Sequence, residues 1–322
     1  MAGLAHFLYS QLFEKLPHPS QRYTDQTIIV TGSNVGLGLE AARHFTRLDA
    51  AKVILAVRSL SKGEAAKKSI EESTKSRGVV EVWHLDLGSY ASVKEFAKKA
   101  EGLDRLDALV ENAGIAPHKY STFEDNEATI TVNVVSTFLL GLLLLPKLRE
   151  SGQKFNVTPH LAIVSSEVHA WSPLNERKSD RIFDTLNNEY TANMSDRYQV
   201  SKLLEVFPCR ELATRTKQSG KADVIINYLN PGLCHSELAR DGPFMLAVMK
   251  FFLARSTEHG SRSLVNAVEG GKETHGQYLS DCRVTPPAPL VTGPEGPEIQ
   301  KRVWNELSAK LEKIQPGIMG NV

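Results

Sequence analysis

Short apolar runs alternate with amphipathic stretches along most of this chain. The apolar runs lie at 27–32, 52–57, 80–87, 106–114, 160–166, 223–232 and 277–280. Most of them are continuously hydrophobic, which is typical of parallel strands that helices cover on both faces. Helical patterns such as GLEAARHFTRL and ASVKEFAKKAE lie between most of these runs. The alternation predicts a Rossmann-type, doubly wound α/β fold with a seven-stranded, mostly parallel sheet and helices on both faces.

The chain divides into a short N-terminal segment and one large domain. Residues 1–23 combine an apolar stretch with the proline-containing linker LPHPSQRY, and residues 24–322 form a single domain that includes a C-terminal helix. The first 13 residues are too short to span a bilayer and lack the basic start and cleavage site of a secretion signal. We expect a short helix docked on the domain, with a membrane-surface anchor as the alternative. The linker predicts that removal of residues 1–20 leaves a folded, active protein.

Three further stretches depart from the simple alternation. The apolar run at 138–148 is also too short to span a membrane, and a buried helix accounts for it better. Residues 171–196 are polar and irregular, and we expect them to form one wall of the functional site. The run FMLAVMKFFLA at 244–254 is apolar on nearly every side, which predicts burial against a ligand, a partner or the domain itself.

Charge and cysteine content exclude several classes of function. Lys and Arg total 38 against 37 Asp and Glu, so no net field favours a nucleic-acid partner. The three cysteines form no CxxC pair, and neither an HExxH nor a GxSxG motif occurs. We therefore expect free thiols, no metal and no serine-hydrolase chemistry. The expected protein is cytoplasmic, a monomer or a homodimer, with peripheral contact on an internal membrane as the alternative.

The first apolar run ends in a glycine-rich loop, TGSNVGLG, that leads directly into a helix. Its glycines are Gly32, Gly36 and Gly38. Glycines allow a tight turn and a close approach of the backbone to a diphosphate, and the N-terminus of the following helix offers free N–H groups. The position of this loop in the first strand-to-helix turn predicts a dinucleotide site.

The end of the second apolar run indicates which dinucleotide is bound. Enzymes that use NAD usually place a carboxylate here, on the ribose hydroxyls. This chain has Arg58, followed by Lys62, and no Asp or Glu from Lys52 to Gly63. A guanidinium suits the 2′-phosphate of NADP(H), which is therefore the expected cofactor.

At this point the chain resembles the short-chain dehydrogenase/reductase family over roughly residues 25–282. The loop from Thr31 to Gly38 matches its TGxxxGxG motif, Asn112-Ala113-Gly114 matches NAG, and the segment from Tyr198 to Lys202 matches YxxSK. Glu111 departs from the asparagine that is commoner in that family. The length, VRSLSKG and PGLCHSEL are most similar to the retinol-dehydrogenase-like branch, especially its fungal members. By this resemblance and the loop argument, the expected cofactor-binding residues are Gly32, Ser33, Asn34, Gly36, Leu37, Gly38, Arg58, Lys62, Asp86, Leu87, Asn112, Ala113, Gly114, Tyr198, Lys202, Pro231, Gly232 and Ser236.

The same resemblance implies four catalytic residues: Asn133, Ser166, Tyr198 and Lys202. A spacing of four puts Tyr198 and Lys202 on one face of a helix, where the ammonium is expected to lower the tyrosine pKa. Tyr198 would exchange a proton with the substrate oxygen, and Ser166 would bind that oxygen. Lys202 would also hold the nicotinamide ribose, and Asn133 would hold a water molecule that connects Lys202 to solvent. Ser166 is preferred to Ser165 on the family pattern, and His169 is expected to have a packing role.

These features together predict an NADP(H)-dependent oxidoreductase, either a ketoreductase or an alcohol dehydrogenase. Its substrate is expected to be a bulky, lipophilic ketone or alcohol, in keeping with secondary metabolism. Two other functions stay open at this point. One is a catalytically silent sensor or scaffold that binds NADP(H), and the other is a non-redox cyclase or epimerase on the same fold. Fold alone does not decide among them.

Overall fold

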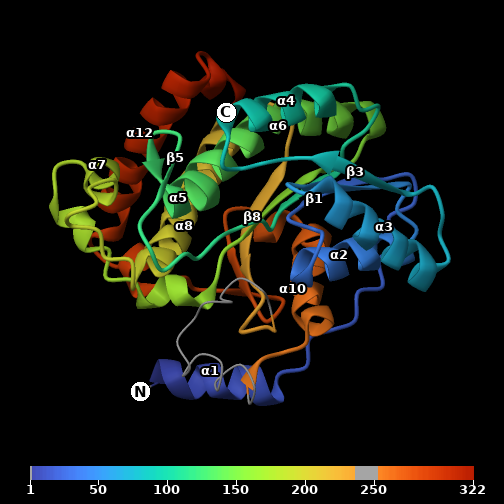
Figure 1. Cartoon of the computed structure of the whole chain (residues 1–322), viewed down its shortest axis with the longest axis horizontal. Coiled ribbons are helices and arrows are strands. Elements are labelled where there is room, and N and C mark those ends of the chain that lie inside the picture. Colours follow the sequence, from blue (N-terminus) through green and yellow to red (C-terminus); the bar gives the residue numbers. More distant parts are fainter. Residues whose placement is uncertain (1, 236–252) are drawn as a thin grey trace.

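The computed structural model describes residues 2–235 and 253–322, and it is built around one twisted sheet (Figure 1). Across the described residues this sheet has eight strands in the order β10-β9-β8-β7-β4-β1-β2-β3. The strands are β1 (Thr27–Thr31), β2 (Lys52–Val57), β3 (Val80–His84), β4 (Ala108–Glu111), β7 (His160–Val164), β8 (Ile225–Asn230), β9 (Tyr278–Ser280) and β10 (Arg283–Thr285). The doubly wound α/β fold predicted from the hydrophobic pattern is confirmed.

The sheet differs from the prediction only at its edge. All seven predicted strands are present and parallel to their neighbours, and β10 adds an eighth strand that pairs antiparallel with β9. At three residues, β10 is too short and too exposed to leave an apolar pattern in the sequence. A separate two-stranded ribbon, β5 (Thr122–Phe123) with β6 (Asn126–Glu127), is also too short to predict.

Helices cover both faces of the sheet because alternate strand residues point to opposite sides. Ile28 and Val30 pack with α2 (Gly36–Arg47), α3 (Leu60–Thr74) and α10 (Thr257–Glu269). Ile29 lies on the other face, in the core formed with α4 (Tyr90–Glu101), α6 (Thr137–Phe155) and α8 (Arg197–Gln218). The terminal helix α12 (Gly296–Ile314) packs against α8, as Figure 1 shows.

The apolar run at 138–148 lies in α6, as expected of a buried helix. The helical stretch is longer than predicted, because the short α5 (Ala128–Ile130) and a π-helical turn, η1 (Thr131–Ser136), continue directly into α6. Residues Ala128–Phe155 are long and apolar enough to cross a membrane, but 94% of their most apolar window is buried inside the protein. That burial is what a core helix requires.

The N-terminal helix α1 (Ala2–Phe13) is docked on the domain beneath the sheet's carboxyl edge (Figure 1). Phe7 and, just beyond the helix, Leu16 are almost fully buried. Arg255 Nη2 donates to the Ser10 carbonyl oxygen at 2.7 Å and to Asp281 Oδ1 at 2.7 Å, so α1 is tied to two distant segments. These contacts argue against the expectation that residues 1–20 are dispensable.

The irregular segment 171–196 packs mainly away from the sheet's carboxyl edge. It contains η3 (Asn175–Lys178) and α7 (Ile182–Leu186), which lies beside α12 in Figure 1. The Glu306 carboxylate on α12 accepts hydrogen bonds from the first two backbone N–H groups of α7, at 3.0 and 2.9 Å. The expectation that this whole segment walls the site is therefore wrong, and only Trp171 reaches it.

Candidate active site

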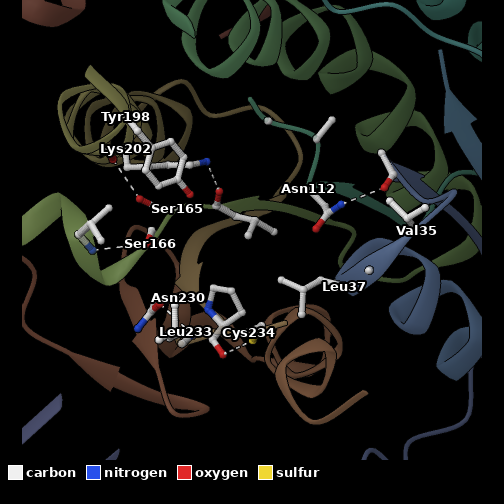
Figure 2. A pocket seen from close by; sticks show the side chains of 18 of the residues that line it. Val35, Leu37, Asn112, Ser165, Ser166, Tyr198, Lys202, Asn230, Leu233 and Cys234 are labelled. Atoms are coloured by element: carbon white, nitrogen blue, oxygen red, sulfur yellow. Dashed lines mark hydrogen bonds between the residues drawn. The ribbon is translucent and has the colours of Figure 1, made fainter. Parts of the chain in front are cut away.

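A cleft of about 540 Å³ opens at the carboxyl ends of the parallel strands. Loops that follow β1, β2, β4, β7 and β8 line it, together with α8 and α1, and Figure 2 shows Tyr198 and Lys202 facing Val35 and Leu37 across it. Its volume is in the range of small-molecule and cofactor sites. The predicted residues that line it are Gly32, Asn34, Gly36, Leu37, Arg58, Lys62, Asn112, Ala113, Gly114, Ser166, Tyr198, Lys202, Pro231 and Gly232.

The glycine-rich loop requires glycine for two different reasons. Gly32 has φ +64°, and a Cβ on it would lie 2.9 Å from the Ala113 Cα, so the loop can pass β4 only without a side chain. Gly36 also has a positive φ, but a Cβ there would meet no atom within 4 Å and would point into open space. Because Gly36 begins α2 and lines the cleft, this open space lies where the free N–H groups of the helix can hold an anion.

Two residues of this loop support it from within. The Ser33 side chain is fully buried and its hydroxyl donates to the Val30 carbonyl oxygen at 2.7 Å, so its side chain is not available to a cofactor. Gly38 lies below the loop, where a Cβ would be 2.6 Å from Asn112 Nδ2 and 2.8 Å from the Gly32 carbonyl oxygen. Both residues shape the loop rather than line the cleft.

Basic side chains lie at the end of the cleft near β2. Arg58 and Lys62 are exposed, and Ser59 lines the cleft between them. Asp86 and Leu87, which follow β3, lie outside the lining. The Asp86 carboxylate accepts a hydrogen bond from the Gly88 N–H at 2.8 Å and thereby holds its own turn.

The Asn112-Ala113-Gly114 segment ties the ends of β1 and β4 together. The backbone N–H groups of Asn112 and Ala113 both donate to Thr31 Oγ1, at 3.0 and 2.9 Å. Asn112 Nδ2 also donates to the Thr31 carbonyl oxygen at 2.9 Å. These bonds hold Gly114 in the cleft beside Lys202, whose Nζ would be 3.7 Å from a Cβ on that glycine.

Asn133 lies in the π-helical turn η1, fully buried and outside the cleft lining. Its Oδ1 accepts from the Ile115 N–H at 2.9 Å, and its Nδ2 donates to the Ile115 carbonyl and to Ser201 Oγ, both at 3.0 Å. The side chain therefore braces the segment after Gly114 against α8. Water would have to bind Asn133 through its main chain, where a π turn rearranges the backbone hydrogen bonds.

Tyr198 and Ser166 meet in the cleft. Their side chains lie next to each other, and Lys202 Nζ lies 5.7 Å from the centre of the tyrosine ring. Burial raises the pKa of Tyr198 above its ordinary value, while the Lys202 ammonium and the Ser166 hydroxyl act in the opposite direction. The expected net lowering is not found, because burial and the negative Glu205 outweigh the ammonium.

The two adjacent serines have different partners. Ser165 is 2% exposed, and its hydroxyl donates to the Lys202 carbonyl oxygen at 2.9 Å. Ser166 is only partly buried and contacts Tyr198. Its carbonyl oxygen accepts from His169 Nδ1 at 2.6 Å, while His169 Nε2 accepts from the Ala288 N–H at 3.0 Å. Buried His169 thus packs beneath the site, in agreement with its expected role.

The loop after β8 closes the cleft from the α1 side. Gly232 has φ +80°, and a Cβ there would lie 2.7 Å from Gln11 Nε2, so this loop passes directly under α1. Cys234 is buried and its Sγ lies 3.5 Å from the Pro231 carbonyl oxygen. Ser236 and most of the run at 244–254 lie outside the described residues.

Several cleft residues carry no sequence motif. Phe7 and Trp171 meet edge to face, with ring centres 6.1 Å apart, although 164 positions of sequence separate residues 7 and 171. An apolar residue in a terminal helix gives no sign of its neighbours, so reasoning from sequence missed this contact. Beyond Trp171, which belongs to the segment expected to wall the site, the lining residues not predicted are Phe7, Val35, Ser59, Val164, Ser165, Glu167, Val168, Asn230, Leu233 and Cys234.

Comparison with known proteins identifies similar sequences along almost the whole chain. The sequence model of the short chain dehydrogenase family matches residues 26–167. The short chain dehydrogenase/reductase dmxR8 of Cryptosporiopsis sp. is 52% identical, over 98% of this chain and 99% of the relative. The short chain dehydrogenase atnD of Emericella nidulans is 51% identical, over 86% of this chain and 90% of the relative.

Solved structures resemble the fold at lower sequence identity. A short chain dehydrogenase from Shigella flexneri has a TM-score of 0.59 at 22% identity, covering 86% of this chain and 99% of its own. The Pseudomonas aeruginosa RhlG/NADP active-site complex has a TM-score of 0.60 at 20% identity, covering 82% of this chain and 97% of its own. At these identities the likeness concerns the fold alone.

Proposed function

Because the chain belongs to the short-chain dehydrogenase family of oxidoreductases, we propose that it is an NADP(H)-dependent enzyme that interconverts a bulky, apolar ketone and its alcohol. One observation carries the proposal. Tyr198, next to Ser166 and close to Lys202, lies in the same cleft as the glycine-rich loop. A proton donor and a dinucleotide-shaped cradle therefore share one cavity.

The side chains fit the chemistry of carbonyl reduction. Ser166 would donate a hydrogen bond to the substrate oxygen, where negative charge develops. Tyr198 would donate its hydroxyl proton to that oxygen, or accept the proton when an alcohol is oxidised. Lys202 would keep positive charge beside Tyr198 and hold the ribose next to it. When bound, the nicotinamide ring supplies or accepts the hydride.

The cradle fits an NADP(H) molecule. The open space at Gly36 and the N-terminus of α2 suit the diphosphate, and a side chain at this position would occupy that space. Arg58 and Lys62 are exposed on the same cleft, and none of the acidic side chains in residues 2–235 and 253–322 lines that end of it. A 2′-phosphate would therefore meet cations without a competing carboxylate.

The substrate class rests on the apolar side chains near Tyr198 and Ser166. Phe7, Val168, Trp171 and Leu233 line the cleft with these two residues. Ring-bearing ketones would remove more apolar surface from water here than small ones would. We expect kcat/KM to rise along a series from acetone-sized to multi-ring ketones, and a flat series would exclude this substrate class.

Oxidation of NADPH with a panel of ketones, followed at 340 nm, tests the function directly. We expect Tyr198→Phe to lower kcat by about 10²- to 10⁴-fold, because a general acid is lost, while the affinity for NADPH stays close to wild type. Tyr190→Phe is a matched control, since Tyr190 is 97% exposed. A Tyr198→Phe variant with wild-type turnover would disprove the assigned proton donor.

A further inference from the structure

A buried ion pair lies directly beneath the catalytic side chains. Lys202 Nζ donates to Glu205 Oε1 at 2.8 Å, and the two side chains are 5% and 2% exposed. The same Nζ donates to the Val164 carbonyl oxygen at 2.8 Å. Glu205 therefore holds one side of the ammonium, while the other side faces the cleft at Gly114.

A second carboxyl group lies next to this pair. Glu111 ends β4, is 4% exposed, and has no hydrogen-bond partner for either carboxyl oxygen among the described residues. Glu205 Oε2 likewise has none there. Burial and the nearby Glu205 carboxylate raise the pKa of Glu111 well above its ordinary value. One of its carboxyl oxygens packs 3.6 Å from where a Cβ on Gly141 would be.

Burying the two unpaired carboxyl oxygens of Glu111 in the core lowers the free energy of unfolding. If packing were the only role of residue 111, an apolar side chain would stabilise the fold better. We propose that Glu205 is a positioning residue of the active site, which fixes the orientation and charge of Lys202, and that the negative charge beneath Lys202 lies on Glu205, which pairs with it, and not on Glu111. The inference rests on the proposed function, because it assigns the pair a part in setting the protonation of Tyr198.

The charge balance follows from the groups that surround the pair. Burial opposes the positive form, but the Glu205 carboxylate raises the pKa of Lys202 above its ordinary value. Burial raises the pKa of Glu205 to about 7. The other titratable groups near the cluster are Tyr198, Cys209 and Arg210 on α8 and Tyr228 on β8. Because burial keeps the Cys209 thiol and the Tyr228 hydroxyl protonated, Glu205 supplies the negative charge.

Glu205→Gln tests the inference because glutamine keeps an oxygen acceptor for Lys202 and loses the charge. Removal of the Glu205 charge lowers the first pKa of the coupled Lys202–Tyr198 pair, whichever of the two groups loses that proton. We expect the basic limb of kcat for ketone reduction to move to lower pH by about one unit, with KM for NADPH and ketone nearly unchanged. A limb that stays in place, or moves to higher pH, would overturn the inference.

Two further variants make the test specific. Glu211→Gln removes a carboxylate elsewhere on the same helix, where Glu211 pairs with Arg215 and not with Lys202, and should leave the pH profile unchanged. Glu111→Gln should also leave the limb in place, because Lys202 pairs with Glu205 and neither carboxyl oxygen of Glu111 has a hydrogen-bond partner among the described residues. Equal shifts in Glu111→Gln and Glu205→Gln would refute the assignment of the charge to Glu205. Glu205→Asn serves the same measurements if the glutamine variant does not fold.

A second measurement needs no enzyme activity. A carboxyl group whose folded pKa is raised keeps its proton in the folded state, so its contribution to stability is lost as pH rises towards about 7. Relative to wild type, Glu205→Gln should therefore gain in Tm between about pH 5 and about pH 7. Parallel Tm curves would overturn the inference. If the wild-type protein reduces no ketone but the two Tm curves still diverge with pH, the proposed function is wrong and the titration of Glu205 is nevertheless supported.

Discussion

Replacement of Arg58 by aspartate should invert the cofactor preference. Arg58 directly follows β2, lines the cleft and has no hydrogen bond or ion pair among the described residues, so its guanidinium is available to a ligand. Aspartate would remove the attraction for a 2′-phosphate, repel it, and offer an acceptor to the free ribose hydroxyls of NADH. The expected phenotype is a protein that still turns over but with NADH.

The size of the effect follows from the exposure of Arg58. Two unit charges about 4 Å apart interact by about 1 kcal/mol in water and by about 4 kcal/mol near a protein surface. Because Arg58 is exposed, a value near the lower limit applies, about 1–2 kcal/mol for attraction and a similar amount for repulsion. The combined change of about 2–4 kcal/mol corresponds to roughly 30- to 1,000-fold in the ratio of kcat/KM for NADPH and NADH.

The assay is kcat/KM for both cofactors in wild type, Arg58→Asp and Arg77→Asp. Arg77 is an exposed arginine outside the cleft lining, so its replacement makes the same charge change without touching the site. Because the Arg58 contact is exposed, salt should weaken the wild-type preference for NADPH. A wild type that uses NADH as well as NADPH, or an Arg58→Asp variant that keeps the wild-type preference, would refute the reasoning.

Three other outcomes test the architecture of the site. Gly32→Ala should lower the free energy of unfolding in urea by about 1–3 kcal/mol, because of the positive φ and the 2.9 Å approach to Ala113; an unchanged midpoint would contradict this. Removal of residues 1–20 should lower Tm and kcat/KM for large ketones, since buried Phe7 lines the cleft; a truncated protein with wild-type values for both would show that α1 only covers surface. Asn133→Ala should lower Tm more than Asn193→Ala, because Asn133 is fully buried and Asn193 is exposed. Equal losses of Tm would show that the three hydrogen bonds of the Asn133 side chain do not contribute to stability.

Residues that act through local backbone geometry were predictable from sequence. The glycine-rich loop lies where the first strand meets the first helix, and Tyr198 and Lys202 share one face of α8. Ser33 was the exception within the loop, because its hydroxyl turns inward to the Val30 carbonyl oxygen. A motif specifies where the backbone turns, but it does not specify which way each small polar side chain points.

What the sequence by itself determined is the order of strands and helices, the cradle and the tyrosine–lysine pair, because each depends on a period or spacing within a few residues. Only the tertiary structure decided that Phe7 meets Trp171 over the cleft, that Ser166 rather than Ser165 contacts Tyr198, and that Glu111 lies near Glu205. These contacts join residues from different elements, and packing between elements leaves no periodic trace in the chain. The Glu111 carboxyl group near the Lys202–Glu205 pair is therefore visible only once β4 and α8 are brought together.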